Sequence, residues 1–182
     1  MPLDPSKCTF MGCCSNLICR GCNIANQKRE FEAGLEKRCA FCREPLAETG
    51  EESHKRVMKR IKENNDPAAM REMGKKHYNE GNYETALEYL TKAAELGDAL
   101  AHFNLSAMYW KGDGVEKDME KETYHLEEAA IEGHPIARHN LGIEEWDNGR
   151  FDRERKHFII AANLGYHDSM KELRKLYANG HA

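Results

Sequence analysis

Apolar residues recur at helical spacing through the second part of the chain, and the whole pattern repeats. Each repeat begins with a small residue that is followed four positions later by methionine or leucine. These pairs are Ala69 with Met73, Ala101 with Leu105, Ala137 with Leu141, and Ser169 with Leu173. Successive pairs are 32, 36 and 32 residues apart, a period typical of stacked helical hairpins. The pattern therefore predicts an all-α helical-hairpin repeat solenoid over residues 67–182, with about three and a half repeats.

A second motif marks the second helix of each predicted hairpin. It is a pair of alanines followed by a glycine, and it occurs as Ala93-Ala94 with Gly97, Ala129-Ala130 with Gly133, and Ala161-Ala162 with Gly165. Small alanines let neighbouring helices approach closely, and glycine fits the left-handed position at which a helix ends. Because both motifs keep the same register, each repeat is expected to contain two helices.

The same register predicts a cap at each end of the solenoid. Asn65 stands where later repeats have the glycine, and Asp66-Pro67 is a typical helix start. Residues 52–64, inside a connecting segment 49–66, are therefore expected to form a half-repeat, and residues 168–178 a lone final helix. Solenoids need such caps because each repeat contacts only its neighbours.

Equivalent places in the repeats also carry aromatic side chains and histidine. His125 and His157 occupy the place that Tyr89 has in the first repeat, which favours a packing role over metal ligation. Trp110 and Trp146 each follow the first helix of a repeat. They would either anchor a partner in a groove or pack at the helix end, and packing is the more ordinary role.

The middle repeat has a longer loop, which reads Gly112-Asp113-Gly114-Val115-x2-Asp118. This loop, inside a 36-residue unit, is similar to that of Sel-one-like repeats. The first repeat, with Gly81-Asn82-Tyr83, is closer in style to tetratricopeptide repeats. The resemblance covers about residues 67–180 and implies a stack that recruits a protein client.

All seven cysteines lie between Cys8 and Cys42. Two C-x2-C pairs, Cys19 with Cys22 and Cys39 with Cys42, are separated by sixteen residues. Two thiolates three residues apart can bind one tetrahedral zinc ion from a single turn, and a second pair completes the ligand shell. Residues 1–48 are therefore predicted to form a small zinc-stabilised domain, with Zn²⁺ in place of a large apolar core.

The cysteine spacing also carries a family resemblance. The run Cys14-x4-Cys19-x2-Cys22, a helix expected over residues 23–33, and Cys39-x2-Cys42-Arg43-x-Pro45 resemble the later part of a RING-type zinc finger. That family holds two zinc ions in a cross-braced pattern. The resemblance implies Cys19 and Cys22, with Cys8 as third ligand, for the first ion, and Cys14, Cys39 and Cys42, with Cys13 in place of the family's histidine, for the second.

Two alternatives remain open from the spacing. The opening C-x2-C pair of a RING finger is missing, which suggests an amino-terminally shortened finger with an incomplete first site. A zinc ribbon would instead group Cys19, Cys22, Cys39 and Cys42 around one ion. The combination of such a finger with these repeats resembles an expanded group of diatom proteins.

Charge and hydropathy disfavour several classes of protein. The 182 residues include 27 Lys and Arg and 31 Asp and Glu, for a formal net charge of −4, without the dense basic stripe of a nucleic-acid-binding surface. No apolar run reaches the ~18 residues that a membrane span requires, and the start does not resemble a signal peptide. We expect a cytoplasmic or nuclear protein, since a reducing compartment favours metal ligation over disulfides.

The resemblance to RING fingers implies ubiquitin transfer as one function. Such a finger positions a charged ubiquitin-conjugating enzyme and forms no covalent intermediate, so no catalytic residue is expected. Ile18, Phe41 and Pro45 would line the docking groove, and Arg43 would clamp ubiquitin. The alternative is a non-catalytic adaptor whose finger is structural only. A zinc hydrolase is disfavoured, because catalytic zinc sites keep an open position and usually include histidine.

Overall fold

The computed structural model describes residues 8–14 and 16–178. The described residues divide into two compact units, residues 8–73 and residues 74–178. The boundary lies inside helix α3 (Pro67–Asn79). The pattern of the sequence places domain boundaries elsewhere, at residues 48/49 and 66/67.

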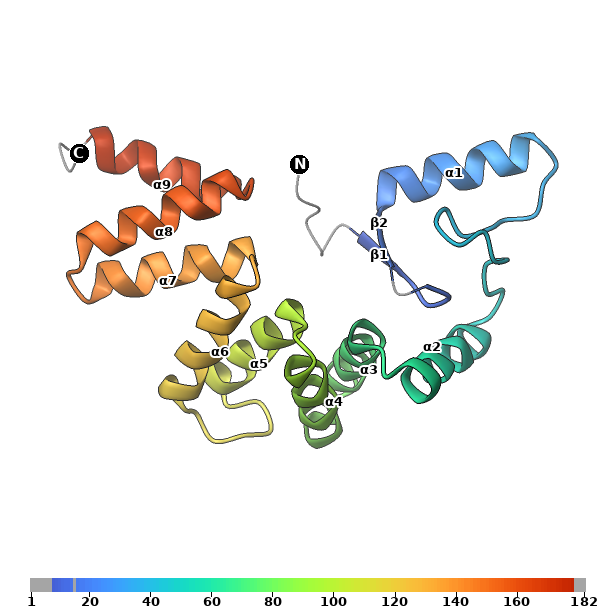
Figure 1. Cartoon of the computed structure of the whole chain (residues 1–182), viewed down its shortest axis with the longest axis horizontal. Helices are drawn as coiled ribbons and strands as arrows, with labels where there is room; N and C mark the ends of the chain where they lie inside the picture. The colour runs from blue at the N-terminus through green and yellow to red at the C-terminus, as the bar shows by residue number, and fades with distance from the viewer. Residues whose placement is uncertain (1–7, 15, 179–182) are drawn as a thin grey trace. The chain divides into compact units, whose positions relative to one another are not determined.

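The first unit begins with a β-hairpin that continues directly into a helix (Figure 1). Strands β1 (Cys8–Met11) and β2 (Asn16–Cys19) are antiparallel, and the backbone of Cys8 pairs with that of Cys19. Helix α1 (Arg20–Glu32) follows without a linker. The two cysteines of the first C-x2-C pair therefore lie at the junction of a strand and a helix.

Helix α1 begins three residues earlier than the expected start at residue 23. Cys19 is its N-cap, and the Cys19 thiol accepts a hydrogen bond from the backbone N–H of Cys22 at 3.2 Å. Cys22 consequently lies inside the first turn. A side chain that caps a helix accepts a hydrogen bond from a backbone N–H that would otherwise lack a partner. The cap therefore allows the helix to begin closer to the N-terminus than the sequence pattern predicts.

The core of the cysteine-rich segment is small. Its buried apolar side chains are Met11, Ile18 and Cys39, with Cys13, Cys14, Ala40 and Leu46 packed around them. Helix α1 contributes little to it, since Ile24 and Phe31 are exposed. An apolar core of this size contributes only weakly to stability.

Helix α2 (Gly50–Asn64) occupies the segment in which a capping helix is expected. It begins where Thr49 Oγ1 accepts a hydrogen bond from the N–H of Glu52 at 3.1 Å, and it ends at Asn65 in the left-handed conformation. Val57 is its buried side chain, and it packs so closely on Gly12 that a Cβ added there would lie 3.0 Å from Val57 Cγ2. Helix α2 is therefore anchored on the turn of the β-hairpin.

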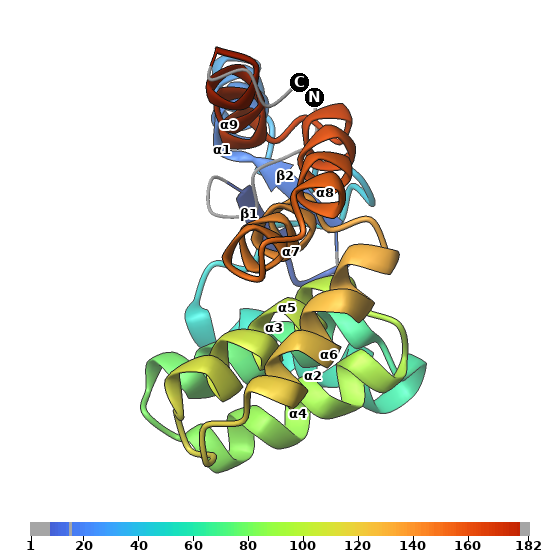
Figure 2. The ribbon, with the colours of Figure 1, turned by 90° about the vertical axis from the view of Figure 1, so that its left-hand side faces the viewer.

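The remaining helices form the repeats (Figures 1 and 2). After α3 they are α4 (Tyr83–Glu95), α5 (Ala99–Lys111), α6 (Met119–Ile131), α7 (Pro135–Asp147), α8 (Phe151–Asn163) and α9 (His167–Ala178). From α4 onward each helix packs on the next, most extensively α5 on α6 and α7 on α8. The prediction of an all-α helical-repeat solenoid is confirmed. Within the residues described, no helix is long and apolar enough to cross a membrane.

Tight packing explains the small residue that follows the apolar residue in the first helix of each hairpin. A Cβ added at Gly74 would lie 2.7 Å from Leu90 Cγ, and one at Gly142 would lie 2.7 Å from Phe158 Cε1. The equivalent place in α5 is the buried Ser106. Helices α3 and α7 thus each have a slot for a large side chain of the helix that follows.

Side chains cap the starts of α5 and α7. Asp98 Oδ1 accepts a hydrogen bond from the N–H of Ala101 at 2.8 Å, and His134 Nδ1 accepts one from the N–H of Ala137 at 3.1 Å. His134 can do so only with an unprotonated Nδ1. Burial lowers the pKa of His134 to about 4, so its ring is neutral near pH 7 and the cap is intact.

The longer loop of the middle repeat packs on the preceding hairpin. Asp113 Oδ2 accepts a hydrogen bond from the Tyr78 hydroxyl at 2.5 Å, and Lys111 Nζ donates one to the same hydroxyl at 3.2 Å. Gly114 lies against Tyr83, where an added Cβ would come within 2.2 Å of Tyr83 Cβ. The insertion therefore joins two repeats.

Candidate metal centre

Four cysteine side chains converge in the first unit. The Sγ atoms of Cys13, Cys14, Cys39 and Cys42 all lie within 4.8 Å of one another. Cys14 Sγ is 3.6 Å from Cys39 Sγ, and Cys13 Sγ is 3.4 Å from Cys42 Sγ. Sulfur ligands at about 2.3 Å from a tetrahedral zinc ion are about 3.8 Å apart. The four thiols therefore have nearly the spacing that such an ion requires.

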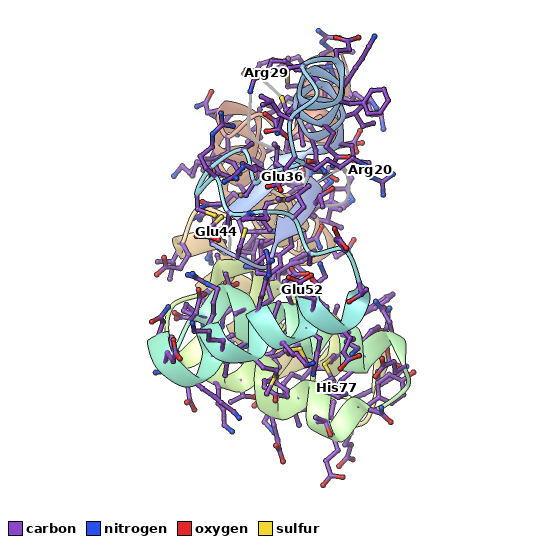
Figure 3. The ribbon with its side chains drawn as sticks, turned by 90° about the vertical axis from the view of Figure 1, so that its right-hand side faces the viewer. Arg20, Arg29, Glu36, Glu44, Glu52 and His77 are labelled. Carbon is purple, nitrogen blue, oxygen red and sulfur yellow. The ribbon has the colours of Figure 1, made fainter. Side chains whose placement is uncertain are left out.

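Two tight turns present these thiols. Cys13 and Cys14 lie in the turn between β1 and β2, where the N–H of Cys14 bonds to the carbonyl of Met11 at 3.1 Å. The second pair lies in residues 37–46, which fold back on themselves because the N–H of Cys39 bonds to the carbonyl of Glu44 at 2.8 Å. The two turns meet with their sulfur atoms facing one another, and sulfur atoms lie close to Glu44 in Figure 3.

A buried carboxylate supports the second turn. Glu30 is the buried residue of α1, and its Oε2 accepts a hydrogen bond from the backbone N–H of Arg38 at 3.0 Å. Its Oε1 lies 3.6 Å from the Arg43 guanidinium. Arg43 has a positive φ of 63°, a conformation that a side chain other than glycine adopts at some cost. Glu30 therefore holds the loop that contains Cys39 and Cys42.

The electrostatics of the cluster favour a cation. Burial raises the pKa of the Cys13 thiol, and the neighbouring thiols of Cys42 and Cys39 raise it further. Without a cation nearby, the Cys13 thiol therefore stays protonated. A divalent metal ion reverses this preference, since it binds the deprotonated sulfur.

Cys19 and Cys22 lie outside this cluster. Cys19 is partly exposed and Cys22 is exposed, and hydrogen bonds from the side chain and then the backbone of Cys22 lower the pKa of the Cys19 thiol. The backbone of Cys8 faces Cys19 across the β-hairpin, while the Cys8 side chain lies outside the part of the chain that the structure describes. The grouping differs from that of a zinc ribbon, because Cys13 and Cys14, in place of Cys19 and Cys22, join the second C-x2-C pair.

The four residues expected at a docking groove have different environments. Ile18, which is expected to line the docking groove, is buried, with 6% of its surface exposed. Strand β2 turns this side chain toward Met11 and Cys39. Phe41 is 49% exposed, and the Arg43 side chain is also exposed although it pairs with Glu30. The carbonyl of Pro45 accepts a hydrogen bond from Arg56.

Basic residues of α2 adjoin the cluster. Arg60 Nη1 donates a hydrogen bond to the carbonyl of Cys13 at 3.3 Å. Arg56, Lys59 and Arg60 line a hollow of about 450 Å³ together with Gly12, Cys13, Glu44, Glu63 and Asn64. The sequence shows these basic residues but not the side they face, since 47 positions separate Arg60 from Cys13.

Histidines of the repeats pack among aromatic rings. The ring of His125 stacks on Tyr109 with centroids 5.6 Å apart, and its Nδ1 lies 3.0 Å from Nδ1 of His102. Burial lowers the pKa of His125 to about 4, and the nearby His102 contributes. A neutral, stacked imidazole serves packing, as the equivalence with Tyr89 indicates.

Comparison with known proteins identifies the repeats. The Sel1 repeat family matches residues 67–98 and 99–134, which contain α3 to α6 and the longer loop. HcpC of Helicobacter pylori, whose name assigns it provisionally to the beta-lactamases, is 38% identical over 56 residues, which are 31% of this chain and 19% of HcpC. The cysteine-rich segment lies outside the residues that the family matches.

Two solved structures share the fold. A Sel1 repeat protein from Oxalobacter formigenes has a TM-score of 0.65 and 26% identity over 87% of this chain and 64% of that one. The protective antigen c5321 of uropathogenic Escherichia coli, which displays an SLR fold, has a TM-score of 0.65 and 20% identity over 87% of this chain and 34% of that one. The chain thus spans less than two thirds of the length of each of these relatives. It contains Sel1 repeats in a helical solenoid.

Proposed function

We propose that this protein is a non-catalytic scaffold, in which the Sel1 repeats recruit a protein client and the cysteine-rich finger is a structural zinc domain. The observation that carries the proposal is the pair of Sel1 repeats at residues 67–98 and 99–134 within a helical solenoid. Sel1 repeats mediate protein–protein interaction, and stacked helical hairpins offer an extended surface to a partner. We propose that the protein acts in the reducing cytoplasm or nucleus, where its thiols remain reduced and can bind a metal ion.

The donor set supports a structural role for the finger. Four thiols gather within 4.8 Å of one another, and four sulfur ligands fill the coordination shell of Zn²⁺. Structural zinc sites are closed in this way, whereas catalytic sites keep a position open for water or substrate. The residues that would hold the ion are Cys13, Cys14, Cys39 and Cys42.

Zinc would also supply stability that the finger lacks. Among the residues that the structure describes, the apolar core of the segment contains three buried side chains. Structural zinc binding contributes about 10–16 kcal/mol to the folding of small finger peptides near pH 7. The finger is therefore proposed to be ordered when it is loaded with zinc.

Native mass spectrometry with paired variants tests the metal site. We expect Cys39→Ser to remove the ion held by the four-cysteine cluster and Cys22→Ser to leave that ion in place. A second ion that Cys22→Ser removes would support the first RING-like site with Cys8, Cys19 and Cys22. Protein purified in the presence of zinc that nevertheless carries no ion would overturn the zinc proposal.

A second experiment tests recruitment by the repeats. Binders are selected from a displayed library of protein fragments against the immobilised, zinc-loaded full chain, and are then photo-crosslinked to it. The scaffold proposal expects crosslinks within residues 74–182. Failure to select any binder, or crosslinks confined to the finger, would contradict it.

A RING-type ubiquitin ligase is the second candidate function. In its favour, the clustered thiols match the second zinc site of a cross-braced finger, and Phe41 beside ligand Cys42 is exposed. Against it, Ile18 is buried. The assay combines the protein with activating enzyme, a panel of ubiquitin-conjugating enzymes, ubiquitin and ATP. Ubiquitin chains that form with the wild type and vanish with Cys39→Ser would establish the ligase and displace the purely structural role of the finger.

A further inference from the structure

The last hairpin and the final helix enclose a hollow of about 440 Å³. Its lining residues come from α7, α8 and α9, and they are His139, Ile143, Trp146, Glu154, Phe158, Glu172, Lys175 and Leu176. A volume of this size accommodates a few side chains of a bound peptide. The hollow lies wholly within the second unit.

Apolar groups form much of this hollow. Phe158 and Leu176 are buried, whereas Trp146 and Ile143 are each 44% exposed. Trp146 makes an edge-to-face contact with Phe151, with ring centroids 5.0 Å apart. An exposed indole is the kind of aromatic anchor that dominates peptide and protein recognition.

The charges in the hollow favour a cationic ligand. Glu172 contributes a partly exposed carboxylate, which Lys175 pairs with at 2.8 Å, and Glu154 contributes a second acidic group that is buried, with 3% of its surface exposed. His139 adds no charge near neutral pH, because burial lowers its pKa and its Nδ1 shares a hydrogen bond with Ser169 Oγ at 2.8 Å. Residues 74–182 as a whole hold 14 Lys and Arg and 20 Asp and Glu, so the surrounding field has the same sign.

We propose that this hollow binds a peptide segment of the client in which an arginine or lysine stands next to an apolar residue. The aliphatic stem of the basic side chain would lie along the apolar wall, and its charged end would meet the indole face and the carboxylates. The apolar neighbour would contact Ile143. This inference rests on the proposed scaffold function and specifies the chemistry of its partner.

A matched pair of tryptophans makes the inference testable. Trp110 stands one repeat earlier, at the place in α5 that Trp146 has in α7, and is 58% exposed, but it does not line this hollow. Trp146→Ala therefore removes the anchor, and Trp110→Ala is the control. Glu172→Gln removes one carboxylate at a partly exposed position, where the substitution leaves the fold intact.

The experiment pans a random dodecapeptide phage library against the zinc-loaded full chain and measures the selected peptides by calorimetry. We expect enriched sequences with Arg or Lys beside Leu, Ile or Phe. Their affinity should fall at least tenfold with Trp146→Ala, fall severalfold with Glu172→Gln, weaken as salt rises, and stay unchanged with Trp110→Ala.

Three results would overturn the assignment. Enriched peptides without a basic residue, or affinities that Trp146→Ala leaves unchanged, would show that this hollow is not the binding site. The proposal that residues 74–182 recruit a client elsewhere on their surface would be unaffected. A dimer that forms in ultracentrifugation and dissociates with Trp146→Ala would assign the hollow to a second copy of the chain. If the fragment selection also yields no binder, the scaffold function fails as well.

Discussion

Arg60 donates a hydrogen bond to the backbone carbonyl of Cys13 at 3.3 Å, so helix α2 is joined to the turn that contains two of the clustered thiols. The same guanidinium binds Asp66 Oδ2, with its Nε at 2.7 Å. Asp66 in turn accepts hydrogen bonds from the N–H groups of Ala68 and Ala69 at the start of α3. One side chain thus connects the candidate metal centre to the first repeat helix.

We expect Arg60→Gln to weaken both ends of this connection. The free energy of unfolding should fall by about 1–3 kcal/mol, because the buried carboxylate of Asp66 loses a charged donor. Release of zinc to a chromogenic chelator should become severalfold faster, since the ligand turn loses its tether to α2. Lys62→Gln, at an exposed position of the same helix, is the control, and equal behaviour of the two variants would disprove the connection.

Removal of the metal should destabilise the finger and leave the stability of the repeats unchanged. Chelation is expected to expose the amides of residues 8–46 to hydrogen exchange, because that segment has few buried apolar groups. The amides of α4 to α8 should keep their protection, since fully buried Leu90, Leu105 and Leu126 hold those helices. Hydrogen exchange with mass spectrometry reports both regions at once. Unchanged protection of the finger without metal would refute its dependence on zinc.

Gly114→Ala should destabilise the solenoid strongly. The new methyl group would collide with Tyr83, where an added Cβ lies at 2.2 Å, and the backbone φ is 72°. Overpacking and the strain of the left-handed backbone together should lower the free energy of unfolding by about 2–5 kcal/mol. Urea unfolding measures this change.

Gly149→Ala is the matched control for this change. Gly149 has the same φ of 72° but has no neighbouring atom within 4 Å of an added Cβ. Gly149→Ala should therefore lower the free energy of unfolding only by the backbone strain, which is about 1–2 kcal/mol. Equal losses in the two variants would show that the contact between the loop and Tyr83 contributes nothing.

His134 should make helix α7 sensitive to acid. Its pKa is about 4 in the folded chain against about 6.5 in an unfolded one, so the unfolded state binds more protons between these values. Its stabilising contribution is complete above about pH 6.5 and declines as the pH falls toward 4. Glu144 has the opposite effect, and its contribution to stability increases as the pH falls. The cause is that burial and then Glu122 raise its pKa to about 7 in the folded chain.

His134→Asn isolates the contribution of the histidine. Asparagine also caps a helix but does not titrate, so the difference in stability between wild type and variant should change with pH while the contribution of Glu144 cancels. Hydrogen exchange of the α7 amides at pH 7.5 and pH 5 measures it. A difference that stays constant between these values would contradict the assignment.

The repeat architecture follows from the sequence because its signals are local. Ala101 and Leu105 repeat with the helical period, and Gly97 or Gly133 ends a helix through its own left-handed backbone. Asn65 adopts the left-handed conformation for the same reason. Such features depend on neighbours a few positions away, so a pattern along the chain reveals them.

Some details of the fold depend on contacts that a pattern does not show. The start of α1 at Arg20 follows from the capping thiol of Cys19, and the burial of Ile18 follows from the direction in which β2 faces. The longer loop is visible in the sequence, but its contact with Tyr78 and Tyr83 is not.

Composition and spacing are enough to show that cysteines are concentrated in the first 48 residues and that helical hairpins follow. The partners of the thiols stayed open, because C-x2-C spacing fits a cross-brace without excluding a ribbon. Only the folded chain shows that Cys13 and Cys14 meet Cys39 and Cys42. These pairs are far apart along the chain, and a β-turn and a distant loop come together only when the residues between them fold.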